Sequence, residues 1–172
     1  MMTLMMITAE VELRICTADD ASAVSLVLKE AFAEYESLYT KKGYEATAAA
    51  RSAIVARMQQ GPLWGAIYDK HVVGTASVVQ KGADLYVRGM AVIPAVRGLG
   101  VGRLLLKQIE AFANEYHYER LFLSTTPFLI RAIRLYAGFG FCVIPDGPHD
   151  LFGTPLLTME KALRPRSTLL AR

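Results

Sequence analysis

Residues 90–102 constrain the fold of this chain more than any other stretch, because two kinds of secondary structure meet there. A short apolar run stops at Pro94, and an amphipathic run with apolar residues at helical spacing begins at Arg103. Three glycines stand at alternate positions between them: Gly98, Gly100 and Gly102. The pattern predicts a strand, a glycine-rich turn and a helix. Because such a turn exposes backbone N–H groups at the positive end of the helix, it predicts a site for an anion such as a phosphate.

The spacing of these glycines excludes two common nucleotide-binding turns. A dinucleotide-binding fingerprint needs a third glycine where this chain has Arg103. The phosphate loop of nucleotide triphosphatases ends in Gly-Lys-Ser/Thr, which is missing here. What remains is Arg97-x-x-Gly100-x-Gly102, which resembles the pyrophosphate-binding signature of the acetyl-CoA-dependent N-acetyltransferases of the GNAT superfamily. For these residues alone, an ordinary glycine-rich strand-to-helix turn is the alternative.

A second segment, residues 132–141, strengthens the resemblance. It reads Ala-Ile-Arg-Leu-Tyr-Ala-Gly-Phe-Gly-Phe and is similar to the second signature of the superfamily. In that signature a short helix carries a tyrosine toward the thioester sulfur, and here Tyr136 takes that place. The two signatures stand in the expected order, with room for one helix and one strand between them. The resemblance covers roughly residues 10–162.

The resemblance implies a site for acetyl-CoA as co-substrate, with no metal. The implied cofactor-binding residues are Met90, Ala91, Val92, Arg97, Gly98, Leu99, Gly100, Val101, Gly102, Arg103 and Tyr136. Tyr136 is also the candidate catalytic acid, because a phenol carries its proton at neutral pH and can donate it to a departing thiolate. The alternative for Tyr136 is a core aromatic residue.

Two positions depart from the superfamily pattern. Leu129 stands where many relatives carry a cofactor-contacting asparagine. The glutamate that some relatives use as a general base aligns with Tyr86, so the strand before the turn lacks that base. A water chain or a residue of the flanking loops is left open for the role. The loop candidates are Glu34, Glu36, Asp146 and His149.

The acceptor is expected to enter through the loops at residues 34–44 and 145–153. The candidate substrate-binding residues are Tyr35, Tyr86, Arg88 and His149. Counting back from Val92 at period two predicts that Met90, Arg88 and Tyr86 all face the substrate. Arg88 has two interpretations, a structural ion-pair partner or a contact for an acidic group on the acceptor.

Periodicity and turn signals predict an α/β fold with a mixed, mostly antiparallel central sheet of six to seven strands flanked by helices. The expected strands cover about residues 10–16, 63–68, 72–79, 84–93, 120–124, 141–144 and 154–160. The expected helices cover about residues 17–37, 45–60, 100–115 and 128–137. A helix joins strands 84–93 and 120–124, so these two are expected to be parallel. In the superfamily they splay apart, and the pantetheine arm lies in the gap.

Composition limits the remaining function classes. With 172 residues, 53% of them hydrophobic, the chain is most simply one domain, with a core at about 10–162 and a basic tail at 163–172. A net charge of +3 offers no basic stripe for nucleic acid. No run is long enough for a membrane span, and the apolar start lacks the features of a signal peptide. Two cysteines without metal-ligand spacing favour a reducing cytoplasm.

The sequence therefore predicts a cytoplasmic enzyme that moves an acetyl group from acetyl-CoA to a primary amine, most simply of a small molecule, in a ternary complex. An acyl-CoA-binding module without turnover and a protein-lysine or N-terminal acetyltransferase are the alternatives. A homodimer is left open.

Overall fold

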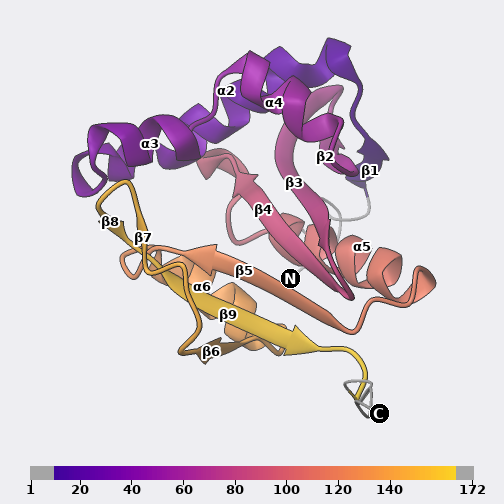
Figure 1. Ribbon diagram of the computed structural model, residues 1–172. Coiled ribbons are helices and arrows are strands. Elements are labelled where there is room, and N and C mark those ends of the chain that lie inside the picture. Colours follow the sequence, from indigo (N-terminus) through magenta and orange to yellow (C-terminus); the bar gives the residue numbers. More distant parts are fainter. Residues whose placement is uncertain (1–9, 166–172) are drawn as a thin grey trace.

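A seven-stranded sheet organises residues 10–165, the part of the chain that this computed structural model describes (Figure 1). The strand order is β1-β2-β3-β4-β5-β9-β6. All neighbours are antiparallel except β4 and β5, which are parallel. The expected mixed, mostly antiparallel sheet is confirmed, and so is the parallel pair on either side of the helix that follows the glycine turn.

The strands of this sheet are β1 (Glu12–Ile15), β2 (Leu63–Tyr68), β3 (His71–Lys81), β4 (Asp84–Val92), β5 (Arg120–Thr125), β6 (Cys142–Ile144) and β9 (Leu157–Ala162). A separate hairpin consists of β7 (Asp150–Leu151) and β8 (Thr154–Pro155). The helices are α2 (Ala21–Phe32), α3 (Lys41–Thr47), α4 (Arg51–Met58), α5 (Val101–Glu115) and α6 (Ile130–Gly138). Three short 3₁₀ helices are η1 (Ala18–Asp20), η2 (Ala33–Leu38) and η3 (Pro94–Val96).

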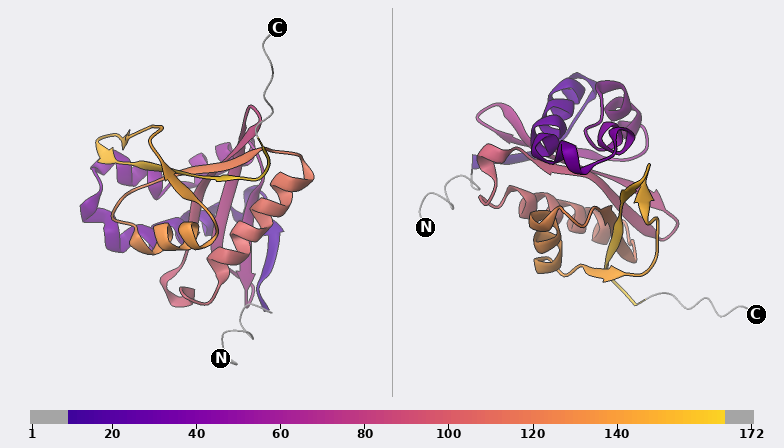
Figure 2. Two further views of the ribbon diagram at one scale, coloured as in Figure 1. Left: turned by 90° about the horizontal axis from the view of Figure 1, so that it is seen from below. Right: turned by 90° about the vertical axis from the view of Figure 1, so that its left-hand side faces the viewer.

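Helices cover both faces of the sheet (Figures 1 and 2). On one face α2 and α4 bury apolar residues such as Val24, Leu28 and Ile54. On the other face α5 buries Leu105 and Ile109 in the larger of the two cores, to which α6 also contributes. Burying these side chains is the main source of stability.

The region between α2 and β2 differs from the expected one helix, loop and second helix. The predicted helix over 17–37 becomes η1, α2 and η2. The helix α3 begins in the predicted loop and extends into the predicted second helix over 45–60, the rest of which contains α4. Thr40 caps α3, because its hydroxyl accepts a hydrogen bond of 3.1 Å from the amide of Gly43. With this cap, residues that lack a strong apolar periodicity form a helix. The missing periodicity is why the sequence pattern predicted a loop.

The end of the chain also differs from the expectation. The predicted strand over 154–160 is divided between β8 and β9, and β8 pairs with β7 instead of the main sheet. Within the main sheet β9 lies between β5 and β6.

A β-bulge at Gly89 changes which way the residues of β4 face. Thr75 pairs with Ala91, whereas Ser77 pairs with Arg88, so one residue of β3 opposes two of β4. Gly89 has a φ of +60°, which a glycine adopts without strain. The prediction that Met90 shares a face with Arg88 and Tyr86 is therefore wrong, because period-two counting fails across an inserted residue.

Strands β4 and β5 part soon after they begin. They are paired only from Asp84 to Tyr86 on β4 and from Arg120 to Phe122 on β5. Beyond this point the two strands diverge, as Figure 1 shows. Ala91 and Val92 therefore pair with β3 on one side, and Met90–Val92 have no strand partner on the other side within residues 10–165. The expected splayed pair is confirmed.

Two predictions fall partly or wholly outside the described residues. The apolar start lies within residues 1–9, and most of the basic tail lies within residues 166–172. Between these segments, no helix is both long and apolar enough to cross a membrane.

Candidate active site

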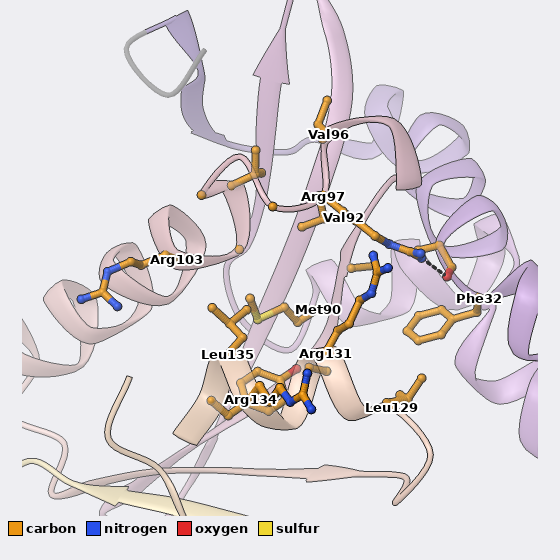
Figure 3. Close-up of a pocket in the computed structure, with 18 of the residues that line it drawn as sticks. Phe32, Met90, Val92, Val96, Arg97, Arg103, Leu129, Arg131, Arg134 and Leu135 are labelled. Carbon is orange, nitrogen blue, oxygen red and sulfur yellow. Dashed lines mark hydrogen bonds between the residues drawn. The ribbon is translucent and has the colours of Figure 1, made fainter. Parts of the chain in front are cut away.

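A cavity of about 660 Å³ opens where β4 and β5 part (Figure 3). Three structural units line it: the end of β4, the turn that leads into α5, and α6. Ala31, Phe32 and Tyr35, from α2 and η2, form a further wall. The cavity thus brings together both sequence signatures, which lie on separate elements, and residues of the less regular region after α2.

Most of the predicted cofactor-binding residues line this cavity. They are Met90, Ala91, Val92, Arg97, Gly98, Gly100, Val101, Gly102, Arg103 and Tyr136. Leu99 is the exception, because it packs against the core instead. Leu129 also lines the cavity, so an apolar side chain stands where many members of the resembled superfamily carry an asparagine.

The three glycines of the turn serve two different purposes. Gly98 and Gly100 have φ values of +76° and +85°, in the left-handed region that side chains disfavour. Gly102 lies in α5, where a Cβ would stand 2.7 Å from Cδ2 of Leu135 on α6. The first two glycines therefore shape the turn, while the third lets α5 and α6 approach each other beside the cavity.

The N-terminus of α5 can bind an anion. Gly100 is its N-cap, and no side chain caps the helix there. The first amides of a helix have no partner within the helix, and their dipoles favour negative charge. No acidic residue stands in the first turn of α5 to compete for them.

Arg97 lines the cavity, but its charge is already paired. Its guanidinium forms an ion pair with Glu34 and donates a hydrogen bond of 2.7 Å to the carbonyl oxygen of Ala31. Its side chain therefore ties the turn to the C-terminal end of α2. Glu34, one of the candidate bases, is engaged in the same contact.

Three further arginines surround the cavity. Arg131 and Arg134 are exposed residues of α6, and within residues 10–165 neither forms an ion pair. Figure 3 shows Arg131 reaching toward the turn that carries Arg97. Arg103 lies over the ring of Phe139, 5.6 Å from its centroid. Sequence reasoning missed Arg131 and Arg134, although their spacing of three residues on a short amphipathic helix was a usable signal.

Tyr136 lies on the buried side of α6 and lines the cavity. Its ring is 5.9 Å from that of Phe141, whose amide donates a hydrogen bond to the Tyr136 carbonyl. Burial raises the pKa of Tyr136, and the phenols of Tyr39 and Tyr86 raise it further. This phenol therefore keeps its proton throughout the neutral range.

The two loops through which the acceptor was expected to enter lie side by side. The amide of Thr40 donates a hydrogen bond of 2.9 Å to Thr154, and the Thr40 hydroxyl donates one of the same length to the carbonyl oxygen of Phe152. Next to this junction Tyr39 and Tyr44 line a second cavity of about 470 Å³. The lining also includes Glu36, so this candidate base lies away from the main cavity.

The candidate substrate residues are separated in the structure. Tyr35 lines the main cavity and stacks on Phe128, with 6.3 Å between ring centroids. Tyr86 packs against Phe122 and lies near enough to Tyr136 to affect its pKa. His149 is exposed in the loop before β7 and does not line the cavity. Arg88 donates a hydrogen bond to Gln60 and forms no ion pair within the described part of the chain, so its interpretation as a structural ion-pair partner is wrong.

Comparison with known proteins identifies relatives of this chain. The sequence model of the acetyltransferase (GNAT) family matches residues 25–141. The Escherichia coli protein named uncharacterized N-acetyltransferase YjgM is 30% identical over 135 residues, which are 75% of this chain and 80% of that protein. An uncharacterized N-acetyltransferase of Schizosaccharomyces pombe is 35% identical over 88 residues, about half of each chain.

Solved structures share the same fold. The PaiA N-acetyltransferase of Thermoplasma acidophilum, solved in complex with coenzyme A, superposes with a TM-score of 0.76 at 17% identity and covers 88% of this chain and 98% of its own. An acetyltransferase of the GNAT family from Staphylococcus aureus superposes with a TM-score of 0.75 at 17% identity and covers 90% of this chain and 99% of its own.

Proposed function

Because the chain belongs to the acetyltransferase (GNAT) family and is an acetyl-CoA-dependent acyltransferase, we propose that it acts as a single N-acetyltransferase domain that acetylates a primary amine of a small molecule. The amine attacks the thioester directly in a ternary complex. The observation that carries this proposal is one cavity that joins the uncapped N-terminus of α5, the free edge of β4 and the phenol of Tyr136.

The anionic end of acetyl-CoA is held by the turn and by α6. The amides at the start of α5 offer hydrogen bonds to the diphosphate, and the left-handed Gly98 and Gly100 let the chain approach it closely. Arg131 and Arg134 add positive charge from the facing helix. Arg97 holds the turn in place through Glu34 and Ala31.

The pantetheine arm is held by the end of β4. In the part of the chain that the structure describes, Met90–Val92 have no strand partner toward β5, so their backbone groups can pair with the amides of an extended ligand. A backbone N–H near Val92 polarises the thioester carbonyl. The thioester supplies the activated acetyl group.

Tyr136 assists the departure of the thiolate. Its hydroxyl stays protonated because burial raises its pKa, so it can donate a hydrogen bond or a proton to the developing negative charge on sulfur. The same burial excludes water from the sulfur, which makes that hydrogen bond stronger than it would be in solution.

The acceptor amine loses its proton through water. No aspartate, glutamate or histidine within residues 10–165 lines the main cavity. Glu34 is held by Arg97, and Glu36 lies in the neighbouring cavity. The absence of a carboxylate or imidazole at the reacting end supports removal of the proton by solvent in place of a fixed side chain.

The experiment that tests this function is release of free thiol from acetyl-CoA with a panel of small amines, amino acids and aminoglycosides. A lysine-rich peptide is included as the macromolecular acceptor. Turnover with a small amine, and a far weaker rate with the peptide, is the expected result. Acetyl-CoA binding by calorimetry without turnover on any acceptor would instead support the acyl-CoA-binding module, and a preference for the peptide would support the protein acetyltransferase.

A further inference from the structure

Two arginines meet between α4 and β4 without a carboxylate beside them. Arg57 comes from α4, and Arg88 from β4 just before the bulge at Gly89. Both side chains are half-buried. Within residues 10–165 all five ion pairs lie elsewhere, so no acidic side chain neutralises either charge.

Several N–H groups of this pair have no acceptor. Arg57 donates one hydrogen bond of 3.2 Å to the carbonyl oxygen of Ala46, and Arg88 donates one to the side chain of Gln60. The Nε group of Arg88 is buried and has no partner among the described residues. Since a guanidinium has five N–H groups, most of the donors of both residues form no hydrogen bond to residues 10–165.

Arg57 lies directly over the bulge. A Cβ on Gly89 would stand 2.8 Å from Nη1 of Arg57, so the glycine leaves room for this guanidinium. The left-handed φ of Gly89 and the position of Arg57 are therefore coupled. The fold places the second positive charge next to the first, at a point where β4 already deviates from a regular strand.

This arrangement is unfavourable without an anion. Burial lowers the pKa of both guanidinium groups, and the charge of Arg88 lowers that of Arg57 further. An arginine nevertheless stays charged in proteins. Two like charges that are partly removed from water, together with an unpaired buried donor, carry a free-energy cost that a bound oxyanion would relieve.

The arginine pair and the reacting end of the cavity share Tyr86 as a neighbour. The phenol of Tyr86 interacts electrostatically with both arginines and also with Tyr136. Tyr86 therefore links the arginine pair to the residue proposed to act at the thioester. An acceptor that carries both an amine and an acidic group could engage the two places at once.

We propose that Arg57 and Arg88 bind an anionic oxyacid group of the acceptor, so that the substrate is a small amine that also carries a carboxylate or a phosphate. This inference rests on the proposed function for the amine end of the acceptor. The planar guanidinium fork matches both anions with paired hydrogen bonds, and both arginines have N–H groups to offer.

Matched acceptors provide the first test. Thiol release is measured for amino acids against their carboxamides, and for phosphoethanolamine against ethanolamine. We expect kcat/KM to be at least about tenfold higher for the anionic member of a pair. The amino-acid pairs report on a carboxylate and the phosphoethanolamine pair on a phosphate. Equal or better turnover of the neutral members would overturn the proposal.

Variants locate the effect on the two arginines. Arg57→Gln and Arg88→Gln are each expected to raise KM for the preferred anionic acceptor by about tenfold and to affect its neutral partner far less, so that the preference for the anionic member is lost. Arg51→Gln, which removes an exposed arginine of the same helix, is the matched control. An equal loss of kcat/KM for the anionic and the neutral acceptor would show that the two arginines have only a structural role.

A binding measurement separates this proposal from the proposed function. Thermal shift of the CoA-loaded protein is recorded with each acceptor, and it needs no turnover. Stabilisation by the anionic members alone, lost in Arg57→Gln and Arg88→Gln, is expected even if no acetyl transfer occurs. If acetylation of neutral amines proceeds and no anionic molecule stabilises the protein, the function stands and this inference fails.

Discussion

The carboxylate of Glu34 binds the guanidinium of Arg97 and so joins the turn before α5 to the end of α2. The same guanidinium donates a hydrogen bond to the Ala31 carbonyl. We predict that Arg97→Ala lowers the free energy of unfolding by about 1–2 kcal/mol, because it removes two charge-assisted hydrogen bonds at a partly exposed site. Acetyl-CoA binding, measured by calorimetry, is expected to weaken by less than about fivefold. A loss of binding without a loss of stability would show that Arg97 contacts the cofactor directly.

Arg131 and Arg134, which form no ion pair with residues 10–165, are expected to matter more for acetyl-CoA binding. The double variant Arg131→Gln/Arg134→Gln removes two exposed cations beside the cavity, each contributing about 0.5–1 kcal/mol, so the dissociation constant is expected to rise by about tenfold. The effect is expected to shrink at high salt, where exposed charges are screened. Arg51→Gln is the control. A double variant with unchanged affinity at low salt would place the diphosphate elsewhere.

A substitution at Gly102 tests the close contact between α5 and α6. In Gly102→Ala the new Cβ displaces Leu135, which itself lines the cavity, so acetyl-CoA affinity is expected to fall severalfold. Stability measured by denaturation is expected to change by less than about 1 kcal/mol, because alanine favours the helix over glycine by a similar amount. A second substitution, Leu135→Ala, is expected to restore part of the affinity. Tight binding by Gly102→Ala alone would contradict this packing argument.

Tyr136→Phe separates turnover from binding. The substitution keeps the ring and removes the hydroxyl, which acts only when charge develops on sulfur. We expect kcat to fall by about 10²–10⁴-fold, the usual contribution of a general acid, while the acetyl-CoA dissociation constant stays within about threefold. Steady-state kinetics with an established acceptor and calorimetry give the two quantities. Wild-type turnover in this variant would make Tyr136 a packing residue.

The ion pair between Arg14 and Asp20 lets us predict how the free energy of unfolding depends on pH. Hydrogen bonds and the ion pair with Arg14 lower the pKa of Asp20 to about 2, from an ordinary value near 3.8. Because the folded-state pKa is the lower one, this contribution is present above about pH 4 and is lost as the pH falls toward 2. Arg14→Gln is expected to lower stability at neutral pH by less than about 1 kcal/mol, because Arg14 is exposed.

Denaturation of both proteins between pH 7 and pH 2 checks this expectation. The difference between wild type and Arg14→Gln is expected to diminish toward the acidic end, since protonated Asp20 no longer pairs with Arg14. A difference that is constant over the whole range would mean that Arg14 stabilises the fold by packing alone.

Local sequence patterns were sufficient for the elements that carry the two signatures. Three local patterns predict β4, the turn and α5: the apolar run before Pro94, the glycines after it and the helical spacing after Arg103. Each pattern reflects interactions between residues that are near neighbours in the chain. The same holds for α6, which carries Tyr136. The parallel pairing of β4 and β5 was accessible as well, because a helical crossover between two strands makes them parallel.

Other features depended on contacts between distant residues. The bulge at Gly89 reverses the direction of Met90 relative to Arg88, and an inserted residue leaves no trace in the hydrophobic alternation. The helix α3 requires the cap from Thr40, which is itself held by Thr154 from the other end of the chain. Neither could be read from local periodicity.

By itself, the sequence determined the family, the elements from β2 to α6 and the position of the glycine turn, because these depend on short-range patterns of apolar residues and glycines. Only the tertiary structure decided which charges are free at the site. It paired Arg97 with Glu34, and it brought Arg57 beside Arg88 with no ion-pair partner for either among residues 10–165. The physical reason is that Coulomb interactions and desolvation depend on distance in space. These partners, on η2 and the turn or on α4 and β4, become neighbours only when the helices pack onto the sheet.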